Sequence, residues 1–183
     1  MERLIVCLTG MPGAGKSTIA RSLAGRGFAT VSMGDAVRAE AARRGIEPTG
    51  GNLGELMLEL RRAGGPAAVA ALVEGEIEAA PPGAVIVDGI RSNAEIDCLR
   101  AHGRVRILAV HAAASRRLGL LRARARSDDP GDRGGLDERD GREMKVGMSD
   151  SIALADETIS NNDIGVDELV EAAHAAISRW MAE

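Results

Sequence analysis

The stretch CLTGMPGAGKSTIA, residues 7–20, constrains the fold more than any other part of this chain. An apolar run leads into a glycine-rich turn, and the residues after the turn favour a helix. Gly10, Gly15, Lys16 and Ser17 satisfy the pattern G-x-x-x-x-G-K-[ST]. Its glycines let successive backbone N–H groups point into one concavity, where the dipole of the following helix also favours an anion. The stretch therefore predicts a phosphate-binding turn between a buried strand and a helix.

The same turn predicts the ligands ATP and Mg²⁺. Lys16 is expected to reach the β- and γ-phosphates and so to serve as a catalytic residue, while the Ser17 hydroxyl contributes to the metal shell. The expected cofactor-binding residues are Gly10, Pro12, Gly13, Ala14, Gly15, Lys16, Ser17 and Thr18.

Strands and helices alternate along the chain. Apolar runs predict strands at 4–9, 28–32, 84–88, 105–110 and 157–160. Helical patterns are found at 16–24, 35–44, 53–60, 66–79, 93–101, 115–125, 136–145 and 167–181. This order predicts a three-layer α/β fold of the P-loop NTPase type, with a five-stranded parallel sheet and helices on both faces.

Two connections are longer than a simple crossover requires. About fifty residues separate the second and third strands, and a polar segment rich in turn formers follows Arg122. We expect one domain, whose core comprises residues 1–33, 81–121 and 148–183. Residues 34–80 would form a helical acceptor-binding insertion and residues 122–147 a mobile lid, with a disordered surface loop as the alternative for the lid.

Charge and hydropathy narrow the class of protein. The formal net charge of −4 argues against a general nucleic-acid binder. No apolar stretch approaches the ~20 residues that span a bilayer, and the start of the chain lacks a basic leader, so we expect a cytoplasmic protein with no membrane partner.

The cysteines, histidines and aromatic residues point to no further chemistry. Cys7 and Cys98 do not form a CxxC pair and are expected to pack as small apolar residues. The three histidines share no metal-ligand spacing; His111 alone is kept as a candidate, because it ends the fourth predicted strand near the expected site. Because rings are scarce, adenine would lie between aliphatic and arginine side chains, with Arg117 or Arg122 as the expected arginine.

The segment SMGDAVR, residues 32–38, follows the second predicted strand. It resembles the S-x-G-D-x-x-R stretch of adenylate kinase and related nucleoside-monophosphate kinases. The resemblance implies that Arg38 binds an acceptor phosphate and that Gly34 lets the acceptor approach the backbone. Asp35 retains two interpretations: it caps the helix that follows, or it orients or deprotonates an acceptor hydroxyl as a catalytic residue.

The segment VIVDGIRS, residues 85–92, places an acid at the end of a buried strand. In this topology Asp88 lies beside the glycine-rich turn, where it can hold the magnesium shell, partly through water. The segment also resembles the D-G-F-P-R element of adenylate kinases, but it is one residue shorter and lacks the proline. The resemblance implies that Gly89 and Arg91 contact the acceptor; the alternative for Arg91 is a solvent-facing position at a helix start.

Arginines gather where the lid is expected. They are Arg116, Arg117, Arg122, Arg124 and Arg126, followed by Arg139 and Arg142. Cations on a closing lid can stabilise the charge of a phosphoryl group in transfer. By resemblance to adenylate kinases, we expect this role for Arg122, Arg126 and Arg139, with Arg142 as a further candidate. A solvated helix face is the alternative for each of them.

The tail IALADETISNN, residues 152–162, resembles the A-x-A-D-x-x-I-x-N element of dephospho-CoA kinases, which helps to seat adenine. Those enzymes carry a D-x-D-like acceptor motif where this chain has residues 32–35. Over nearly its whole length, the chain most closely resembles a group of archaeal-type adenylate-kinase-like proteins, with GMPGAGKS, VSMGD, VDGIR, DDP and ALAD in this order.

These features predict an ATP- and Mg²⁺-dependent phosphotransferase that acts on a small nucleotide-like acceptor, such as a nucleoside monophosphate. The sequence lacks the NKxD signature of G proteins and is too short for a motor ATPase with a separate lid domain. One alternative is a dephospho-CoA kinase. Another, from a different class, is a regulatory ATPase switch that acts on a protein partner.

Overall fold

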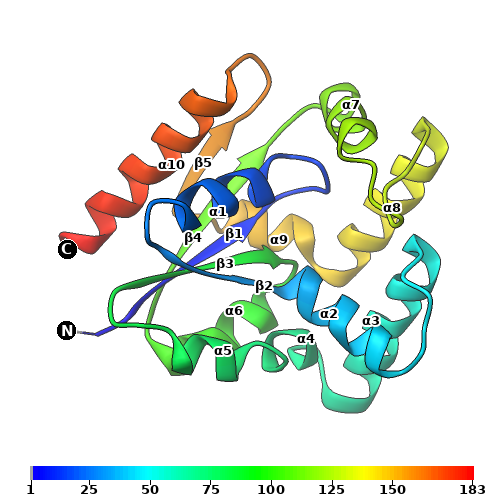
Figure 1. Ribbon diagram of the computed structural model, residues 1–183, viewed down its shortest axis with the longest axis horizontal. Helices are drawn as coiled ribbons and strands as arrows, with labels where there is room; N and C mark the ends of the chain where they lie inside the picture. Colours follow the sequence, from blue (N-terminus) through cyan, green and yellow to red (C-terminus); the bar gives the residue numbers. More distant parts are fainter. Residues whose placement is uncertain (1) are drawn as a thin grey trace.

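A five-stranded parallel sheet forms the centre of the molecule (Figure 1). The computed structural model describes residues 2–183, and its strands lie in the order β2-β3-β1-β4-β5 with all neighbouring pairs parallel. The strands are β1 Leu4–Thr9, β2 Ala29–Ser32, β3 Ala84–Ile90, β4 Arg104–His111 and β5 Glu157–Ser160. The predicted three-layer α/β fold is thereby confirmed.

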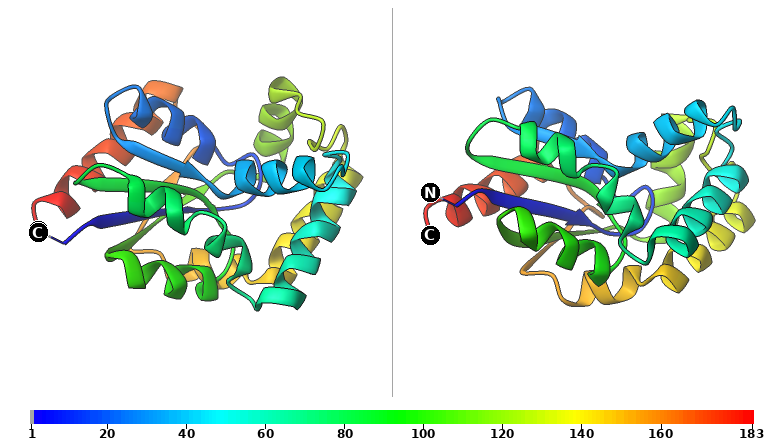
Figure 2. Two further views of the ribbon diagram at one scale, coloured as in Figure 1. Left: turned by 60° about the horizontal axis from the view of Figure 1, so that its bottom comes forward. Right: turned by 90° about the horizontal axis from the view of Figure 1, so that it is seen from below.

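The helices cover both faces of this sheet (Figures 1 and 2). They are α1 Lys16–Ala24, α2 Met33–Arg43, α3 Gly50–Gly64, α4 Ala68–Ala71, α5 Glu74–Ala79, α6 Asn93–Leu99, α7 Ala114–Arg124, α8 Arg133–Val146, α9 Met148–Ala153 and α10 Val166–Met181, with a 3₁₀ turn η1 at Arg100–His102. Across residues 2–183, none of these helices combines the length and the apolar character that a membrane span requires.

The core has two halves, one on each face of the sheet. Every residue of β1 is buried, because a central parallel strand is covered on both sides. Its alternate side chains divide between the halves: Ile5 and Cys7 pack with residues of α2 to α6, whereas Val6 and Leu8 pack with α1 and α10. This arrangement fixes the carboxyl ends of β1 and β3, where the glycine-rich turn and Asp88 lie.

Between β2 and β3 the chain forms α2 to α5, one helix more than the sequence analysis expected. The single helix predicted at 66–79 is wrong: α4 ends at Ala71 and α5 begins at Glu74. Helix α3 spans 15 residues and begins where the Thr49 side chain accepts a hydrogen bond from the Asn52 N–H. Together α2, α3 and α4 pack against the sheet half that contains Ile5.

Between β4 and β5 the chain forms α7, a connecting loop at 125–132, and then α8 and α9. Helix α8 begins at a cap in which the Asp132 side chain accepts from the Gly135 N–H. Ser127 Oγ donates to the Pro48 carbonyl at 2.9 Å and ties the connecting loop to the α2–α3 segment. Helix α9 had not been predicted; its Ser151 is buried and lies 2.7 Å from the Thr9 hydroxyl at the end of β1.

Candidate functional site

The glycine-rich turn joins β1 to α1, as the motif predicts. Gly10 has φ +137°, and a Cβ there would lie 2.2 Å from the Val110 carbonyl oxygen, so only glycine fits beside β4. Gly13 and Gly15 also have positive φ values, which curl the backbone before α1 begins at Lys16. The helix N-terminus therefore points at the concavity of the turn, which suits an anion.

Lys16 folds back over the turn that precedes it. Its Nζ donates to the carbonyls of Gly10 at 2.5 Å and Met11 at 3.2 Å. Burial lowers the pKa of Lys16 to about 8, although the negative charges of Asp88 and Glu143 oppose the shift. An ammonium group held by two carbonyls in this way is poised to exchange them for a phosphate.

Ser17 and Asp88 meet where a magnesium ion would be expected. Ser17 Oγ donates to Asp88 Oδ2 at 2.7 Å, while Asp88 Oδ1 is buried and has no hydrogen-bond partner among residues 2–183. A buried carboxylate oxygen without a partner fits a metal-bound water. No group of three or more acidic, histidine or cysteine side chains in the described chain is arranged to hold a metal ion. A cation here would need phosphate and water ligands as well, which is the usual coordination of Mg²⁺ in phosphotransferases.

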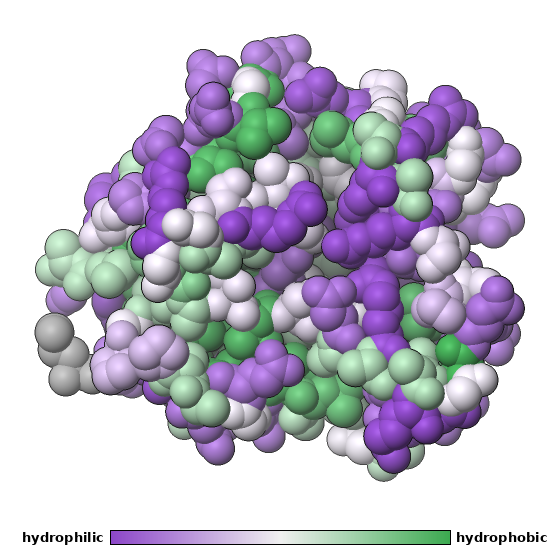
Figure 3. All heavy atoms as spheres, in the orientation of Figure 1, coloured by the Kyte–Doolittle hydropathy of each residue, from purple (hydrophilic) through white to green (hydrophobic). Residues whose placement is uncertain are grey.

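A cleft of about 430 Å³ opens above the turn. In the space-filling view, strongly hydrophilic side chains gather around the hollow between α1 and the α7–α8 segment (Figure 3). The cleft brings together most of the predicted site residues: Gly10, Pro12, Gly13, Gly15, Lys16, Ser17, Thr18, Gly34, Arg38, Asp88, Gly89, Arg91, Arg126 and Arg139.

Four residues predicted to bind phosphate or acceptor do not line this cleft. One of them, Arg142, lines the pocket between α2, α3 and α8 instead. Ala14 is buried, and its carbonyl accepts from Asn161 Nδ2 at 2.8 Å, so it supports the turn from behind. The exposed Arg122 donates to the Gly131 carbonyl at 2.8 Å and lies outside the cleft. Asp35 instead lines a neighbouring hollow that also contains Ser17 and Asp88.

The start of α2 shows why Asp35 is not the helix cap. Ser32 is the cap residue, and its side chain accepts a hydrogen bond from the Asp35 N–H. The Asp35 side chain is 65% exposed and accepts from Arg38 at 2.8 Å. The S-x-x-D spacing in the sequence, three residues from the cap to the acid, is the signal that identifies Ser32. Of the two interpretations of Asp35, the cap is therefore wrong.

Arg91 is enclosed rather than solvent-facing, so the solvent-facing alternative is wrong. Its Nε lies 2.9 Å from Glu143 Oε2 on α8, and its guanidinium also contacts the Met57 sulfur on α3. The fully buried Glu95 accepts from the Arg91 backbone N–H at 2.8 Å and from Arg61 at 2.7 Å. Glu95, which the sequence analysis missed, thus holds the backbone after β3 in place.

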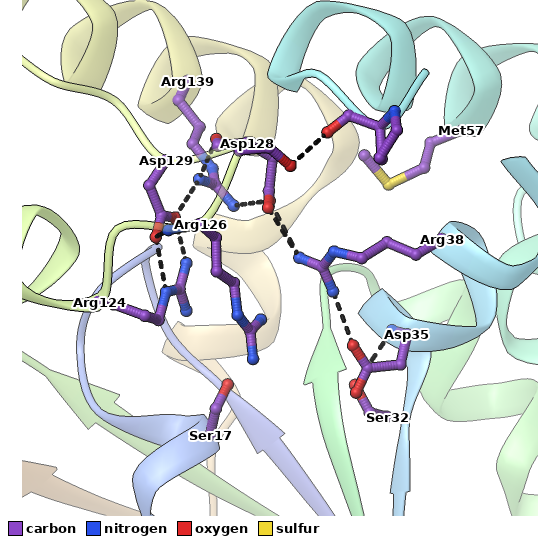
Figure 4. Close-up of polar contacts among 12 residues, drawn as sticks. Ser17, Ser32, Asp35, Arg38, Met57, Arg124, Arg126, Asp128, Asp129 and Arg139 are labelled. Atoms are coloured by element: carbon purple, nitrogen blue, oxygen red, sulfur yellow. Dashed lines mark hydrogen bonds and ion pairs between the residues drawn. The ribbon is translucent and has the colours of Figure 1, made fainter. Parts of the chain in front are cut away.

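The connecting loop supplies two carboxylates to the arginines of the cleft (Figure 4). Asp128 accepts from Arg38 on α2 at 3.0 Å and lies 3.5 Å from Arg139 on α8. Asp129 pairs with Arg124 and Arg139, and it also accepts from the Arg126 N–H at 3.0 Å. Burial raises the pKa of Asp129, but these hydrogen bonds outweigh burial and leave the pKa below its usual value.

Arg126 differs from the other arginines of this cluster. Its side chain points from the loop towards Ser17, and no dashed contact joins it to another residue in the close-up (Figure 4). No described carboxylate forms an ion pair with it, whereas Arg38, Arg124 and Arg139 are all paired. Arg126 is therefore a cation directed at the place where the turn would hold phosphates.

The opposite wall of the cleft corrects the expected adenine contact. Arg117 is buried, pairs with Asp140 at 2.5 Å and donates to the Pro12 carbonyl, and it does not line the cleft. The residues that do line this wall are Arg116, Leu120, Asn161, Val166 and Leu169. Asn161 belongs to the tail motif of residues 152–162. The sequence spacing could not show that Arg116, rather than a neighbouring arginine, lines the cleft.

The remaining predicted polar residues are structural or peripheral. Cys7 is fully buried as expected. Cys98 packs against the core but also donates to Glu74 at 3.1 Å, which an apolar packing role does not include. His174 packs edge-on against Phe28, and His111 is exposed at the end of β4 without lining the cleft.

Comparisons with known proteins agree with this architecture. The sequence model of the family described as AAA domain matches residues 9–133. A UPF0200 protein of Thermococcus kodakarensis is 40% identical over 164 residues, which cover 87% of this chain and 89% of the relative. A UPF0200 protein of Pyrococcus horikoshii is 41% identical over 166 residues, with 87% and 88% covered.

Solved structures of kinases share the fold at low sequence identity. The shikimate kinase of Acinetobacter baumannii, in complex with shikimate, has a TM-score of 0.64 at 13% identity and covers 100% of this chain and 96% of its own. The gluconokinase of Sinorhizobium meliloti 1021 has a TM-score of 0.55 at 16% identity, with 97% and 93% covered. The fold is that of a P-loop kinase, and by its relatives and its matched domain the chain belongs to the UPF0200 family of AAA-domain proteins.

Proposed function

We propose that this protein transfers the γ-phosphoryl group of ATP to a small, nucleotide-like acceptor. One observation carries the proposal. Arg38, Arg91 and Arg139 line both the cleft above the glycine-rich turn and a second pocket of about 230 Å³ between α2, α3 and α8. Three guanidinium groups thus lie at the boundary between a phosphate-binding cleft and a separate pocket, which is where a phosphoryl group would pass from donor to acceptor.

On the donor side, the residues of the turn have distinct tasks. The backbone N–H groups around Gly13 and Gly15 and the Lys16 ammonium would bind the phosphates. Ser17 and Asp88 would hold a magnesium ion, partly through water. Bound Mg²⁺ supplies charge neutralisation of the phosphate oxygens. Val166 and Leu169 offer aliphatic surface for the nucleoside on the opposite wall.

On the acceptor side, the pocket combines apolar and cationic walls. Val37, Leu53 and Met57 supply aliphatic surface, and Arg38 and Arg91 supply positive charge. This combination suits a molecule with an acid group at one end and a less polar body at the other. A nucleoside monophosphate meets this description, and its attacking phosphate oxygen is already ionised, so no general base is required.

A lid that closes over both pockets would keep water from the reaction. Arg126 and Arg139 reach the cleft from the connecting loop and from α8. Excluding water favours transfer to the acceptor over hydrolysis and strengthens the interactions of both arginines with the phosphoryl oxygens. We therefore propose Arg126 and Arg139 as the cations that stabilise the transferred group.

The test is to incubate the purified protein with MgATP and a panel of nucleoside monophosphates, nucleosides and dephospho-CoA. Products are identified by mass spectrometry, with Lys16→Ala as the inactive control and Arg133→Ala, an exposed substitution on α8, as the matched control. We expect one class of monophosphate to gain 80 Da, the mass of one phosphoryl group, with Lys16→Ala inactive and Arg133→Ala active.

If dephospho-CoA were the compound phosphorylated, the proposed acceptor class would be wrong, but the proposed phosphoryl transfer from ATP would stand. ATP hydrolysis without any phosphorylated acceptor would contradict the proposal and favour a regulatory ATPase. The docking of the lid through its own carboxylates is the observation that favours this second candidate, because a nucleotide could change that docking and so alter a surface offered to a protein partner.

A further inference from the structure

Asp128 is an acid at the centre of a cationic site. Its side chain is 6% exposed, although it lies on the loop that connects α7 to α8. Both of its oxygens accept from Arg38 Nη2, at 3.0 and 3.1 Å, and Arg139 Nη2 approaches one of them at 3.5 Å (Figure 4). Two guanidinium groups from different helices therefore converge on a single carboxylate.

Contacts of the connecting loop with the α2–α3 segment hold this carboxylate beside the two arginines. A Cβ on Gly50 would lie 3.2 Å from the Asp128 carbonyl oxygen, so the loop approaches the first turn of α3 closely. Ser127 Oγ holds the loop to the Pro48 carbonyl. Asp128 itself lines the second pocket, which we call the acceptor pocket, but it does not line the cleft above the turn. Arg38 and Arg139 line both.

Arg139 shows that the cations of this site need an anion. Burial lowers the pKa of Arg139, and the nearby charge of Arg91 lowers it further, while Glu143, Asp128 and Asp129 oppose the shift. A buried guanidinium without an anion is strongly destabilising. In this structure Asp128 and Asp129 together supply the negative charge that contacts Arg139.

We propose that the Asp128 carboxylate occupies an oxyanion subsite, and that the acid group of the acceptor displaces it to bind between Arg38 and Arg139. This inference rests on the proposed function for the identity of the acceptor, but the subsite itself is defined by the two arginines. The ligand it takes is a phosphate or carboxylate group.

The chemistry of the two anions makes the exchange reasonable. A carboxylate and a phosphate both accept paired hydrogen bonds from guanidinium groups, and a phosphate offers more oxygens and more charge. Asp128 is carried by a loop rather than by a helix, so its withdrawal does not require a secondary-structure element to unfold. Acceptor binding and displacement of the loop at 125–132 would therefore be coupled.

The subsite is tested by binding of inorganic phosphate, measured by calorimetry, to wild type, Asp128→Asn, Arg38→Gln and the double variant. We expect Asp128→Asn to bind phosphate about tenfold or more tightly than wild type, because an internal competitor for charge-assisted hydrogen bonds is removed. The gain should vanish in the double variant. The four proteins form a double-mutant cycle. Phosphate bound at the glycine-rich turn contributes equally to the affinity of each, so this contribution cancels when the affinities are compared.

Two further variants separate displacement from general loss of structure. Asp137→Asn removes an exposed acid of α8 that pairs with Arg133, and we expect no change in phosphate affinity. Ser127→Ala loosens the loop without altering charge, and we expect a gain of about two- to tenfold from one lost hydrogen bond. If Asp128→Asn does not fold, the Ser127→Ala variant still tests the proposal.

Unchanged or weaker phosphate binding by both Asp128→Asn and Ser127→Ala would overturn the inference and leave Asp128 a structural ion-pair residue. A gain that persists in the double variant would also overturn it, because the phosphate would then lie elsewhere. These outcomes are independent of phosphoryl transfer: a protein without kinase activity that shows the Arg38-dependent gain has the subsite but not the proposed function.

Discussion

Lys16 shows how single residues of this site are prepared for an anion. Its ammonium group is held by the carbonyls of Gly10 and Met11, and its pKa is lowered to about 8. Arg38 and Arg139 are held in the same way by Asp128, whereas Arg126 is not paired with a described carboxylate. Groups that would contact phosphate are thus mostly occupied by atoms of the protein itself, and each should respond measurably when a phosphate replaces those atoms.

For Lys16 the expected response is proton uptake. At pH 8 roughly half of the Lys16 side chains are neutral in the free protein, and a bound triphosphate raises the pKa well above that value. We expect MgATP binding at this pH to take up about half a proton, seen by calorimetry as a dependence on the ionisation enthalpy of the buffer. The Lys16→Met variant provides the control; uptake of the same size in that variant would assign the proton to another group.

For Arg126 the expected response is kinetic. Arg126→Gln removes the cation directed at Ser17, and we expect kcat to fall by about a hundredfold or more with little change in MgATP affinity. Arg133→Gln removes an exposed arginine from the start of α8 and should leave kcat within about twofold, as is usual for exposed pairs. Steady-state kinetics of both variants with the identified acceptor make the comparison, and equal losses would argue against a special role for Arg126.

At the scale of elements, α3 lines the second pocket, which we propose as the acceptor pocket. Gly50 and Gly54 lie one turn apart, so they present backbone on the same face of the helix. The Gly50 position meets the loop at Asp128, and the Gly54 position meets the Arg142 side chain, with the nearest atom 3.6 Å from a Cβ built there. Glycine in a helix interior costs about 1 kcal/mol relative to alanine, and this cost applies to Gly54.

We expect Gly54→Leu to fill the acceptor pocket. Because the leucine side chain would occupy space that the acceptor needs, we expect acceptor KM to rise about tenfold or more, which is about 1.4 kcal/mol or more, while MgATP affinity is unchanged. Gly51→Leu is the matched control, since a Cβ at Gly51 meets nothing within 4 Å. Titrations of both ligands against the two variants check the prediction. If Gly51→Leu raised KM as much, the effect would come from the helix and not from the pocket.

The elements themselves were largely predictable from local pattern. All five strands follow from short apolar runs, and the turn of residues 10–18 follows from its motif. Helix α9 was missed because its six residues are too few to establish a period, and the break between α4 and α5 falls in an alanine-rich stretch without a stop signal. Where tertiary packing decides an element, the local sequence does not show it.

The site was predictable only where its residues are close in sequence. The glycine-rich turn, Asp88 and Arg38 follow from motifs beside strand ends. The partners of the arginines do not: Asp128 meets Arg38 across 90 positions, and Asp140 meets Arg117 across 23. These pairings decide which arginines of a run face the cleft. The sequence alone therefore could not show that Arg126 lines the cleft and Arg122 does not.

At the scale of the whole molecule, residues 122–147, which we propose as a lid, contact the rest of the protein mainly through charged and polar groups. Ser127 and Asp128 join the connecting loop to the α2–α3 segment, and Glu143 joins α8 to Arg91 after β3. Within the lid, Asp129 ties the loop to Arg124 and Arg139. Because these contacts are polar rather than apolar, the lid should open under conditions that leave the sheet folded.

Acid pH provides such a condition. The pKa of Asp129 lies below its usual value in the folded protein, so its ion pairs contribute fully above about pH 4 and are lost as the pH falls through the lowered pKa. Asp129→Asn should imitate this loss at neutral pH, and we expect amide hydrogens of α8 to exchange about tenfold faster. Hydrogen exchange followed by mass spectrometry measures this; equal exchange of β1 in both proteins shows that the core stays folded.

The most direct test of the account is the fate of the γ-phosphoryl group, followed by phosphorus NMR with MgATP and the acceptor that the mass-spectrometric panel identifies. We predict one phosphorylated acceptor for each ADP formed, and little inorganic phosphate while acceptor remains. Steady release of inorganic phosphate at a rate that the acceptor does not change would contradict the assignment as a phosphotransferase.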